Sequence, residues 1–293
     1  MYPEMRWYGS VDALVSAVSP SLSTMCGIDA EIAAREFLDG YCVHCDGVRR
    51  LKVDGGAHFG TDVNLREGLV CQACGLNSRT RQLFASVLRQ YGRGDHIALL
   101  EAFSPFASYV SSVFPLAELS EYHSPSTPGG QISVFSGPDN VSREACHQDM
   151  LALSFEDGSL DGIVHNDVLE HVPDAVAGLA ECRRVLKPGA TALFTMPWFP
   201  WLPETLVRGT LDVDGTLHEI LPTELHGDGI RPEGIYTFFN FGADFAGFLA
   251  ASGFDGIEFG LGYDPFSGAT TNNYRYGVEF LMLPTLIRAT KWT

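Results

Sequence analysis

The chain contains 293 residues, of which 45% are hydrophobic, enough for one large α/β domain together with a smaller module. Its formal net charge of −17 argues against nucleic acid or an anionic membrane as the main partner, because 36 carboxylates repel phosphate groups. No continuous apolar run approaches the roughly 18 residues that span a bilayer, and residues 1–40 lack the pattern of a secretory signal. We therefore expect a cytoplasmic protein without a membrane partner.

The first third of the chain divides into helical and turn-rich segments. In residues 1–40 apolar residues recur at helical spacing, which predicts helices. Residues 41–76 are rich in turns and contain four of the seven cysteines. A helix is expected over residues 78–91, because its apolar residues share one face and Gly92 follows as a stop signal.

The four cysteines of this turn-rich segment form two C-x-x-C pairs, Cys42/Cys45 and Cys71/Cys74. Four thiolates match the tetrahedral preference of zinc and leave no open coordination position, so the pattern predicts a structural zinc site. Four unrelated buried cysteines and a redox dithiol are the alternatives. The remaining cysteines are expected to be small buried hydrophobic residues: Cys26, Cys146 and Cys182.

From residue 95 onward, short apolar strands alternate with helices, as in a parallel α/β sheet. The expected strands are 96–103, 119–123, one that ends at Asp149, 160–165, 190–196, 256–261 and 277–283. Helices are expected at 104–114, after Asn166-Asp167, and at 241–252. The alternation breaks down between residues 198 and 240, where prolines, glycines and aromatic residues predict an inserted cap over the site.

The segment from Asp149 to Pro197 forms one strand–helix–strand unit with polar residues where its strands end. Its phrases FEDGSLDGIVHNDVLEHV and RVLKPG resemble the central motifs of class I S-adenosylmethionine-dependent methyltransferases. The phrases SEY (120–122) and TELHGDGI (223–230) are similar to a bacterial subfamily with an N-terminal cysteine-rich module.

The resemblance extends from about residue 95 to the C-terminus. It implies a Rossmann-like, mostly parallel seven-stranded sheet preceded by a helical and zinc-binding region. The implied division is a helical segment at 1–40, a four-cysteine zinc module with a linking helix at 41–94, and the methyltransferase domain at 95–293 with its cap at about 198–240.

The resemblance also implies residues that bind S-adenosylmethionine at the strand ends. Carboxylates suit this cofactor because they accept hydrogen bonds from the ribose hydroxyls and the adenine amine. A glycine-rich turn usually follows the first strand of this family, and here residues 101–106 (EAFSPF) replace it. The implied binding residues are Glu121 and Tyr122 at the ribose, Asp149 and Met150 at the adenine, Asn166 beside the methionine part, and Glu101, Ala102 and Ser104 in the first loop.

Methyl transfer to a hydroxyl needs a base, and histidines near the expected site are candidates. We expect His226 in the cap as the base, with His171 as the second candidate. The expected substrate is a small molecule such as a sugar, natural product or other metabolite, with O-methylation favoured. Eight basic residues between Arg49 and Arg93 support a zinc-module RNA methyltransferase as the alternative, and the glycine-poor first loop leaves open a non-catalytic scaffold. Whether the chain forms a homo-oligomer also remains open.

Overall fold

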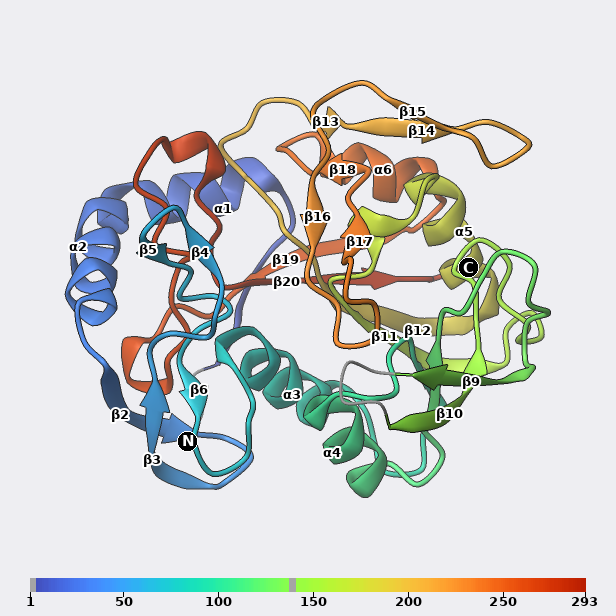
Figure 1. Ribbon diagram of the computed structural model, residues 1–293, viewed down its shortest axis with the longest axis horizontal. Coiled ribbons are helices and arrows are strands. Elements are labelled where there is room, and N and C mark those ends of the chain that lie inside the picture. Colours follow the sequence, from blue (N-terminus) through green and yellow to red (C-terminus); the bar gives the residue numbers. More distant parts are fainter. Residues whose placement is uncertain (1–3, 137–140) are drawn as a thin grey trace.

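The computed structural model describes residues 4–136 and 141–293, and a large twisted sheet forms its centre (Figure 1). Within these residues the sheet has nine strands in the order β1-β19-β20-β12-β11-β7-β8-β10-β9. The pairs from β10 to β12 are parallel, whereas β20 is antiparallel to both of its neighbours. The strands are β1 (Arg6–Tyr8), β7 (Ile97–Leu99), β8 (Glu118–Glu121), β9 (Ile132–Ser136), β10 (Ser142–His147), β11 (Leu160–Asn166), β12 (Leu186–Thr195), β19 (Gly256–Leu261) and β20 (Thr285–Thr290).

The mostly parallel α/β sheet is confirmed, and three details of the strand prediction are wrong. Two antiparallel edge strands, β1 and β9, extend the expected seven strands to nine. The last strand begins at Thr285 and not at residue 277. Residues 281–283 are buried but lie outside any strand, so in the sequence they were mistaken for strand residues. The third strand ends at His147, and Asp149 lies beyond it in a turn.

Helices cover both faces of the sheet, because each central strand alternates its side chains between two hydrophobic cores. On β7, for example, Ala98 belongs to one core and Leu99 to the other. Residues of α1, α5 and α6 fill the first core, and residues of α3 and α4 fill the second. The helices are α1 (Val11–Val18), α2 (Leu22–Ala33), α3 (Ser78–Gln90), α4 (Pro105–Val113), α5 (Ala175–Val185) and α6 (Phe245–Ala251).

The cysteine-rich segment forms two small sheets, and its buried hydrophobic residues belong to the second core. The strands are β2 (Phe37–Cys42), β3 (Gly47–Lys52) and β6 (Val70–Cys71) in one sheet, and β4 (His58–Phe59) and β5 (Asp62–Val63) in the other. The fully buried Arg81 connects this segment to a distant loop, because its guanidinium donates to the carbonyl oxygens of Leu76 and Ser267. The module is therefore packed onto the rest of the chain.

The helical stretch Val11–Ala33 is long and apolar enough, by length and composition, to cross a membrane. The search for a continuous run of about 18 apolar residues missed this stretch because polar residues interrupt it. A hydropathy value averaged over a window is less sensitive to such interruptions. In the structure it is bent into two helices, and its Asp29 is buried. The Asp29 carboxylate accepts hydrogen bonds from Thr271 and Tyr263, which attaches α2 to the C-terminal part of the chain.

Residues 198–240 contain three two-stranded ribbons, and one of them, β16 with β17, is drawn in front of the inner strands of the sheet in Figure 1. A hydrogen bond of 2.7 Å from the Phe238 amide to the carbonyl oxygen of Glu170 connects this cap to the segment after β11. The strands of the cap pair as β13 (Leu206–Val207) with β18 (Phe239–Asn240), β14 (Gly209–Leu211) with β15 (Leu217–Glu219), and β16 (Leu225–His226) with β17 (Ile235–Tyr236).

Candidate active site

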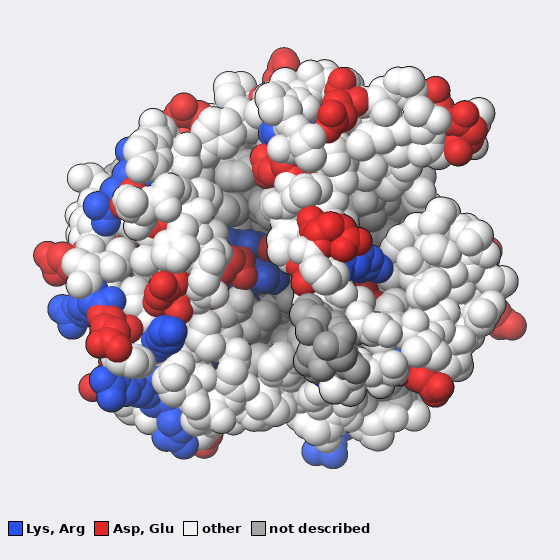
Figure 2. All heavy atoms as spheres, in the orientation of Figure 1, with Lys and Arg blue, Asp and Glu red and all other residues white. Residues whose placement is uncertain are grey.

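A cleft of about 1500 Å³ opens at the carboxyl ends of β7, β8 and β11. The order of the sheet reverses between β7 and β11, since the chain continues outward to β8 on one side and to β12 on the other. Ligands of parallel α/β sheets bind at such a switch point. The cysteine-rich module and the cap form the other walls, and Figure 2 shows the hollow between them.

Glu101 and Asn166 meet at the floor of this cleft. The Glu101 carboxylate accepts a hydrogen bond of 2.5 Å from the Ser104 hydroxyl and one of 3.1 Å from the Asn166 amide. Burial raises the pKa of Glu101, although both hydrogen bonds favour its charged form. Ser104 also accepts from the Ala107 amide and caps α4, with Pro105 in the first turn. A serine–proline helix start therefore replaces the expected glycine turn.

Glu121 lines the same cleft from the end of β8. Burial raises its pKa to about 7, and the nearby Arg231 guanidinium only partly offsets this effect. One of its oxygens accepts from the Tyr122 amide at 3.2 Å. Glu121 is therefore a carboxyl group that changes charge close to neutral pH.

Four other residues predicted at the cofactor are not among those that line the cleft: Ala102, Tyr122, Asp149 and Met150. The Asp149 carboxylate accepts from the Leu151 amide at 2.9 Å and closes a tight turn. Met150 is buried in the core, and Tyr122 is largely exposed with the Arg231 guanidinium 6.0 Å from its ring centre. Their roles at the cofactor stay predictions.

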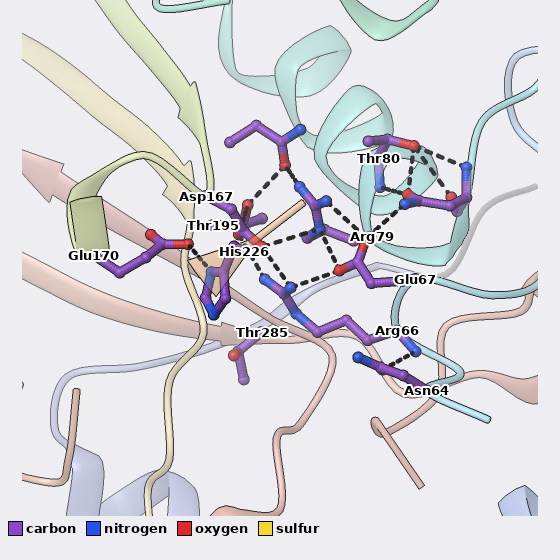
Figure 3. Close-up of polar contacts among 12 residues, drawn as sticks. Asn64, Arg66, Glu67, Arg79, Thr80, Asp167, Glu170, Thr195, His226 and Thr285 are labelled. Atoms are coloured by element: carbon purple, nitrogen blue, oxygen red, sulfur yellow. Dashed lines mark hydrogen bonds and ion pairs between the residues drawn. The ribbon is translucent and has the colours of Figure 1, made fainter. Parts of the chain in front are cut away.

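A buried ion cluster joins the cysteine-rich module to the end of β11 (Figure 3). Asp167 accepts two hydrogen bonds from the Arg66 guanidinium, at 2.6 and 2.7 Å, and lies 3.3 Å from Arg79. Both arginines also contact Glu67 at 2.8 Å, and Arg79 donates to Asn166. Burial would raise the pKa of Asp167, but the two guanidinium groups outweigh it and hold the pKa well below its usual range.

This cluster was not predicted from the sequence. Its only local signal was the polar Asn166-Asp167 step after an apolar strand. Asp167 adopts a left-handed backbone (φ 53°), a conformation that aspartate and asparagine tolerate better than most residues. The partner arginine Arg66 lies 101 residues away in the chain, and no periodic pattern connects positions so far apart.

Glu170, His171 and His226 come together where the cap meets the segment after β11. The Glu170 side chain is fully buried, and one of its oxygens lies 3.6 Å from a ring nitrogen of each histidine. Burial would lower the pKa of His226, but the carboxylates of Glu170 and Glu224 outweigh it and raise the pKa to about 10. A charged imidazole has no lone pair, so His226 can accept a proton only after losing one of its own, and the base role expected for it stays a prediction.

The sulfur atoms of Cys42, Cys45, Cys71 and Cys74 all lie within 4.8 Å of one another. Two of the separations are 3.6 Å (Cys42–Cys74) and 3.9 Å (Cys45–Cys71). Four sulfurs placed tetrahedrally at 2.3 Å from one zinc ion are about 3.8 Å apart. The chemistry and spacing of this donor set therefore fit a closed tetrahedral zinc site.

Comparison with protein families identifies residues 135–194 as similar to a family described as "Methyltransferase domain". No curated protein matches the chain. Among solved structures, an S-adenosylmethionine-dependent methyltransferase from Mesorhizobium loti is 14% identical, with 72% of this chain and 97% of that chain covered and a TM-score of 0.41. The complex of the Haloferax volcanii Trm112 methyltransferase activator with a methyltransferase is 16% identical, with 73% of this chain and 90% of that chain covered and a TM-score of 0.42.

A structure from Bacillus halodurans, described as a methyltransferase, is 16% identical with a TM-score of 0.29. The match covers 40% of this chain and spans only 47% of that protein's length. The family match and the mostly parallel sheet together support a class I S-adenosylmethionine-dependent methyltransferase.

Proposed function

We propose that the protein transfers a methyl group from S-adenosylmethionine to a hydroxyl of a small organic molecule held under the cap. S-adenosylhomocysteine leaves, and the hydroxyl proton passes to one of the carboxylates that line the cleft. The observation that carries this proposal is a large cleft at the switch point of the sheet with more carboxylates than arginines in its lining. When bound, the cofactor supplies an electrophilic methyl group. The chain's own residues bind both reactants, hold them in line and exclude water.

The described side chains fit the cofactor's hydrogen-bond donors. Glu121 offers its carboxylate oxygens to the two ribose hydroxyls, as in the family that the sequence resembles. Glu101, Ser104 and Asn166 form a hydrogen-bonded floor beside it for the methionine part. Asp149 and Met150 are proposed to hold the adenine, which requires the nearby loop to present them differently, because neither lines the cleft in this structure.

The charge of the lining favours a neutral or cationic small molecule over RNA. Seven carboxylates line the cleft against four arginines, and two of each are paired with one another in the buried ion cluster, which leaves five carboxylates against two arginines. Polyanions bind surfaces with an excess of cations. The lining carboxylates are those of Glu67, Glu101, Glu121, Asp167, Glu170, Glu224 and Asp228, and the arginines are Arg66, Arg79, Arg143 and Arg208.

Several cations that suggested an RNA methyltransferase do not belong to an exposed patch. Arg66 and Arg81 are buried, the Arg79 side chain is only 13% exposed, and all three donate to groups of the same chain. Arg49 and Arg50 are at least partly exposed, but neither is among the residues that line the cleft. These observations favour the small-molecule acceptor. We also propose that the four cysteines hold a structural zinc ion that shapes the wall of the cleft.

Cofactor binding is expected to depend on the ionisation of Glu121. Because its pKa is about 7 in the free protein, the carboxylate is present above this pH and is lost as the pH falls. Calorimetry should show the affinity for S-adenosylhomocysteine falling about tenfold between pH 8 and pH 6. Glu121→Gln should weaken binding by roughly 1.5–3 kcal/mol and flatten this dependence. An unchanged pH dependence in the variant would assign it to another group.

The salt dependence of RNA binding distinguishes a small-molecule acceptor from RNA. A small-molecule enzyme should bind RNA weakly, and the double charge reversal Arg49→Glu/Arg50→Glu should leave methyl transfer to a small hydroxyl compound unchanged. An RNA enzyme should instead bind RNA tightly, with an affinity that falls steeply as salt rises and that these substitutions reduce. Tight, salt-sensitive RNA binding by the purified protein would overturn the proposed acceptor class.

A further inference from the structure

We infer that Glu170, His171 and His226 form a binding site for a divalent transition-metal ion inside the cleft, separate from the four cysteines. The inference rests on how these three side chains are held, and it does not depend on the identity of the methyl acceptor. Glu170 and His171 follow β11, whereas His226 comes from the cap, so the site joins the two parts of the chain.

The Glu170 carboxylate is buried without a hydrogen bond from the described part of the chain. Its side chain is 0% exposed, and neither of its oxygens accepts a hydrogen bond from any residue that the structure describes. A buried carboxylate without hydrogen bonds is costly unless it is paired or coordinates a metal ion. Its two neighbours are His171 and His226, each with a ring nitrogen 3.6 Å from Oε1 of Glu170.

Each histidine is oriented by an acceptor on its far side. Nδ1 of His171 lies 2.8 Å from the carbonyl oxygen of Tyr236, and Nε2 of His226 lies 3.1 Å from Oε1 of Glu224. A carbonyl or carboxylate oxygen can only accept, so these far nitrogens carry protons. The near nitrogens, Nε2 of His171 and Nδ1 of His226, face one shared point beside Glu170. A metal ion at this point would displace the Nδ1 proton of His226 and take a lone pair from each ring. Metal-binding histidines are held in this way, with the second ring nitrogen donating to a carbonyl or carboxylate.

The spacing fits ligands of one ion better than hydrogen bonds. Charge-assisted N–H···O bonds are about 2.7–2.9 Å long, and both nitrogen–oxygen separations here are 3.6 Å. Nitrogen and oxygen ligands placed tetrahedrally at about 2.0–2.1 Å from zinc are ~3.3 Å apart, so small shifts would suffice. The rings cross at 88° with their centres 5.0 Å apart, which keeps them from stacking on each other.

The charges around the cluster are compatible with a cation. Glu224 supports His226 with one oxygen and contacts Arg208 with the other at 3.1 Å, so this arginine is already paired. Arg66 and Arg79, the two arginines labelled in Figure 3, are paired with Asp167 and Glu67. Two imidazoles and one carboxylate are the ligand set of many Zn²⁺, Fe²⁺ and Co²⁺ sites. All three residues line the cleft, so open coordination positions would face a bound acceptor.

The test uses Co²⁺ as the probe on protein whose cysteine site already holds zinc, without cofactor or acceptor. We expect one additional equivalent of Co²⁺ per chain, followed by its visible ligand-field absorption. Cobalt at the cysteines would instead give an intense thiolate charge-transfer band, which separates the two sites. Glu170→Gln and His171→Ala should each weaken the added equivalent at least tenfold, with folding checked by circular dichroism.

His218→Ala is the matched control, because His218 is also a cap histidine 2.7 Å from a carboxylate, that of Asp212, but lies outside the three-residue cluster. This variant should bind Co²⁺ like the wild type. No additional equivalent in the wild type, or unchanged binding in folded Glu170→Gln and His171→Ala, would overturn the inference. Because binding is measured directly, this failure is distinct from a failure of methyl transfer.

Discussion

Replacement of Cys71 with Ser is expected to lower the free energy of unfolding by roughly 3–5 kcal/mol, because metal binding at a structural zinc site contributes directly to folding. Cys71 lies in β6, which pairs with β3, and its sulfur is 3.9 Å from that of Cys45. Weaker binding would loosen the module that forms one wall of the cleft. Denaturant unfolding and elemental analysis measure this effect, with about one zinc per chain in the wild type if only the cysteine site is filled.

Cys26→Ser provides the matched control, because Cys26 is a half-buried cysteine of α2 outside the cysteine cluster. We expect this variant to keep its zinc and to change stability by less than about 1 kcal/mol, as for most substitutions that avoid a tightly packed core. A chelator should destabilise the wild type and the control alike, and should affect Cys71→Ser much less. Equal stability of the two variants with full zinc content would contradict a structural zinc at these cysteines.

The second large effect is expected for Asp167→Asn, which removes the central charge of the buried ion cluster. The variant should lose about 3–5 kcal/mol of stability, because Arg66 and Arg79 keep their charges while only Glu67 remains to balance them. Asparagine adopts the left-handed backbone of this position about as readily as aspartate, so backbone strain does not explain the loss. Urea unfolding measures the difference.

The pH dependence of stability is an independent test of the contribution of the Asp167 charge. The folded-state pKa of Asp167 is lowered, so its stabilising contribution is fully present above the unfolded value of ~3.9 and is lost as the pH falls through the folded value. Wild type and Asp167→Asn should therefore converge in stability as the medium becomes strongly acidic. If the gap were the same at every pH, the charge of Asp167 would not be its cause.

Asp157→Asn tests whether burial, and not the ion pair alone, produces this effect. Asp157 contacts Arg184 at 2.6 Å, as close as Asp167 is to Arg66, but its side chain is 82% exposed. Exposed ion pairs contribute about 0–1 kcal/mol because water screens them. A loss for Asp157→Asn as large as that for Asp167→Asn would contradict the role assigned to burial.

The sequence itself determined the alternation of strands and helices and the presence of the cap. It did so because hydrophobic periodicity is a local property: β11, for example, is a continuous buried run, and α3 carries its apolar residues on one face. The same dependence on local pattern explains why the last strand was predicted at the wrong residues. Leu281 and Leu283 are as buried as strand residues, yet only pairing with β12 and β19 decides that the strand is β20.

The cysteine pairs, the carboxylates at strand ends and the cap histidines were also visible in the sequence, because each belongs to a short motif or a strand end. Only the tertiary structure decided which of them meet. Arg66 reaches Asp167 across 101 residues, and His226 is brought beside Glu170 by the fold of the cap, so neither contact leaves a periodic signal. Long-range charge pairing depends on where the backbone places two distant segments, and that placement is a property of the packed molecule.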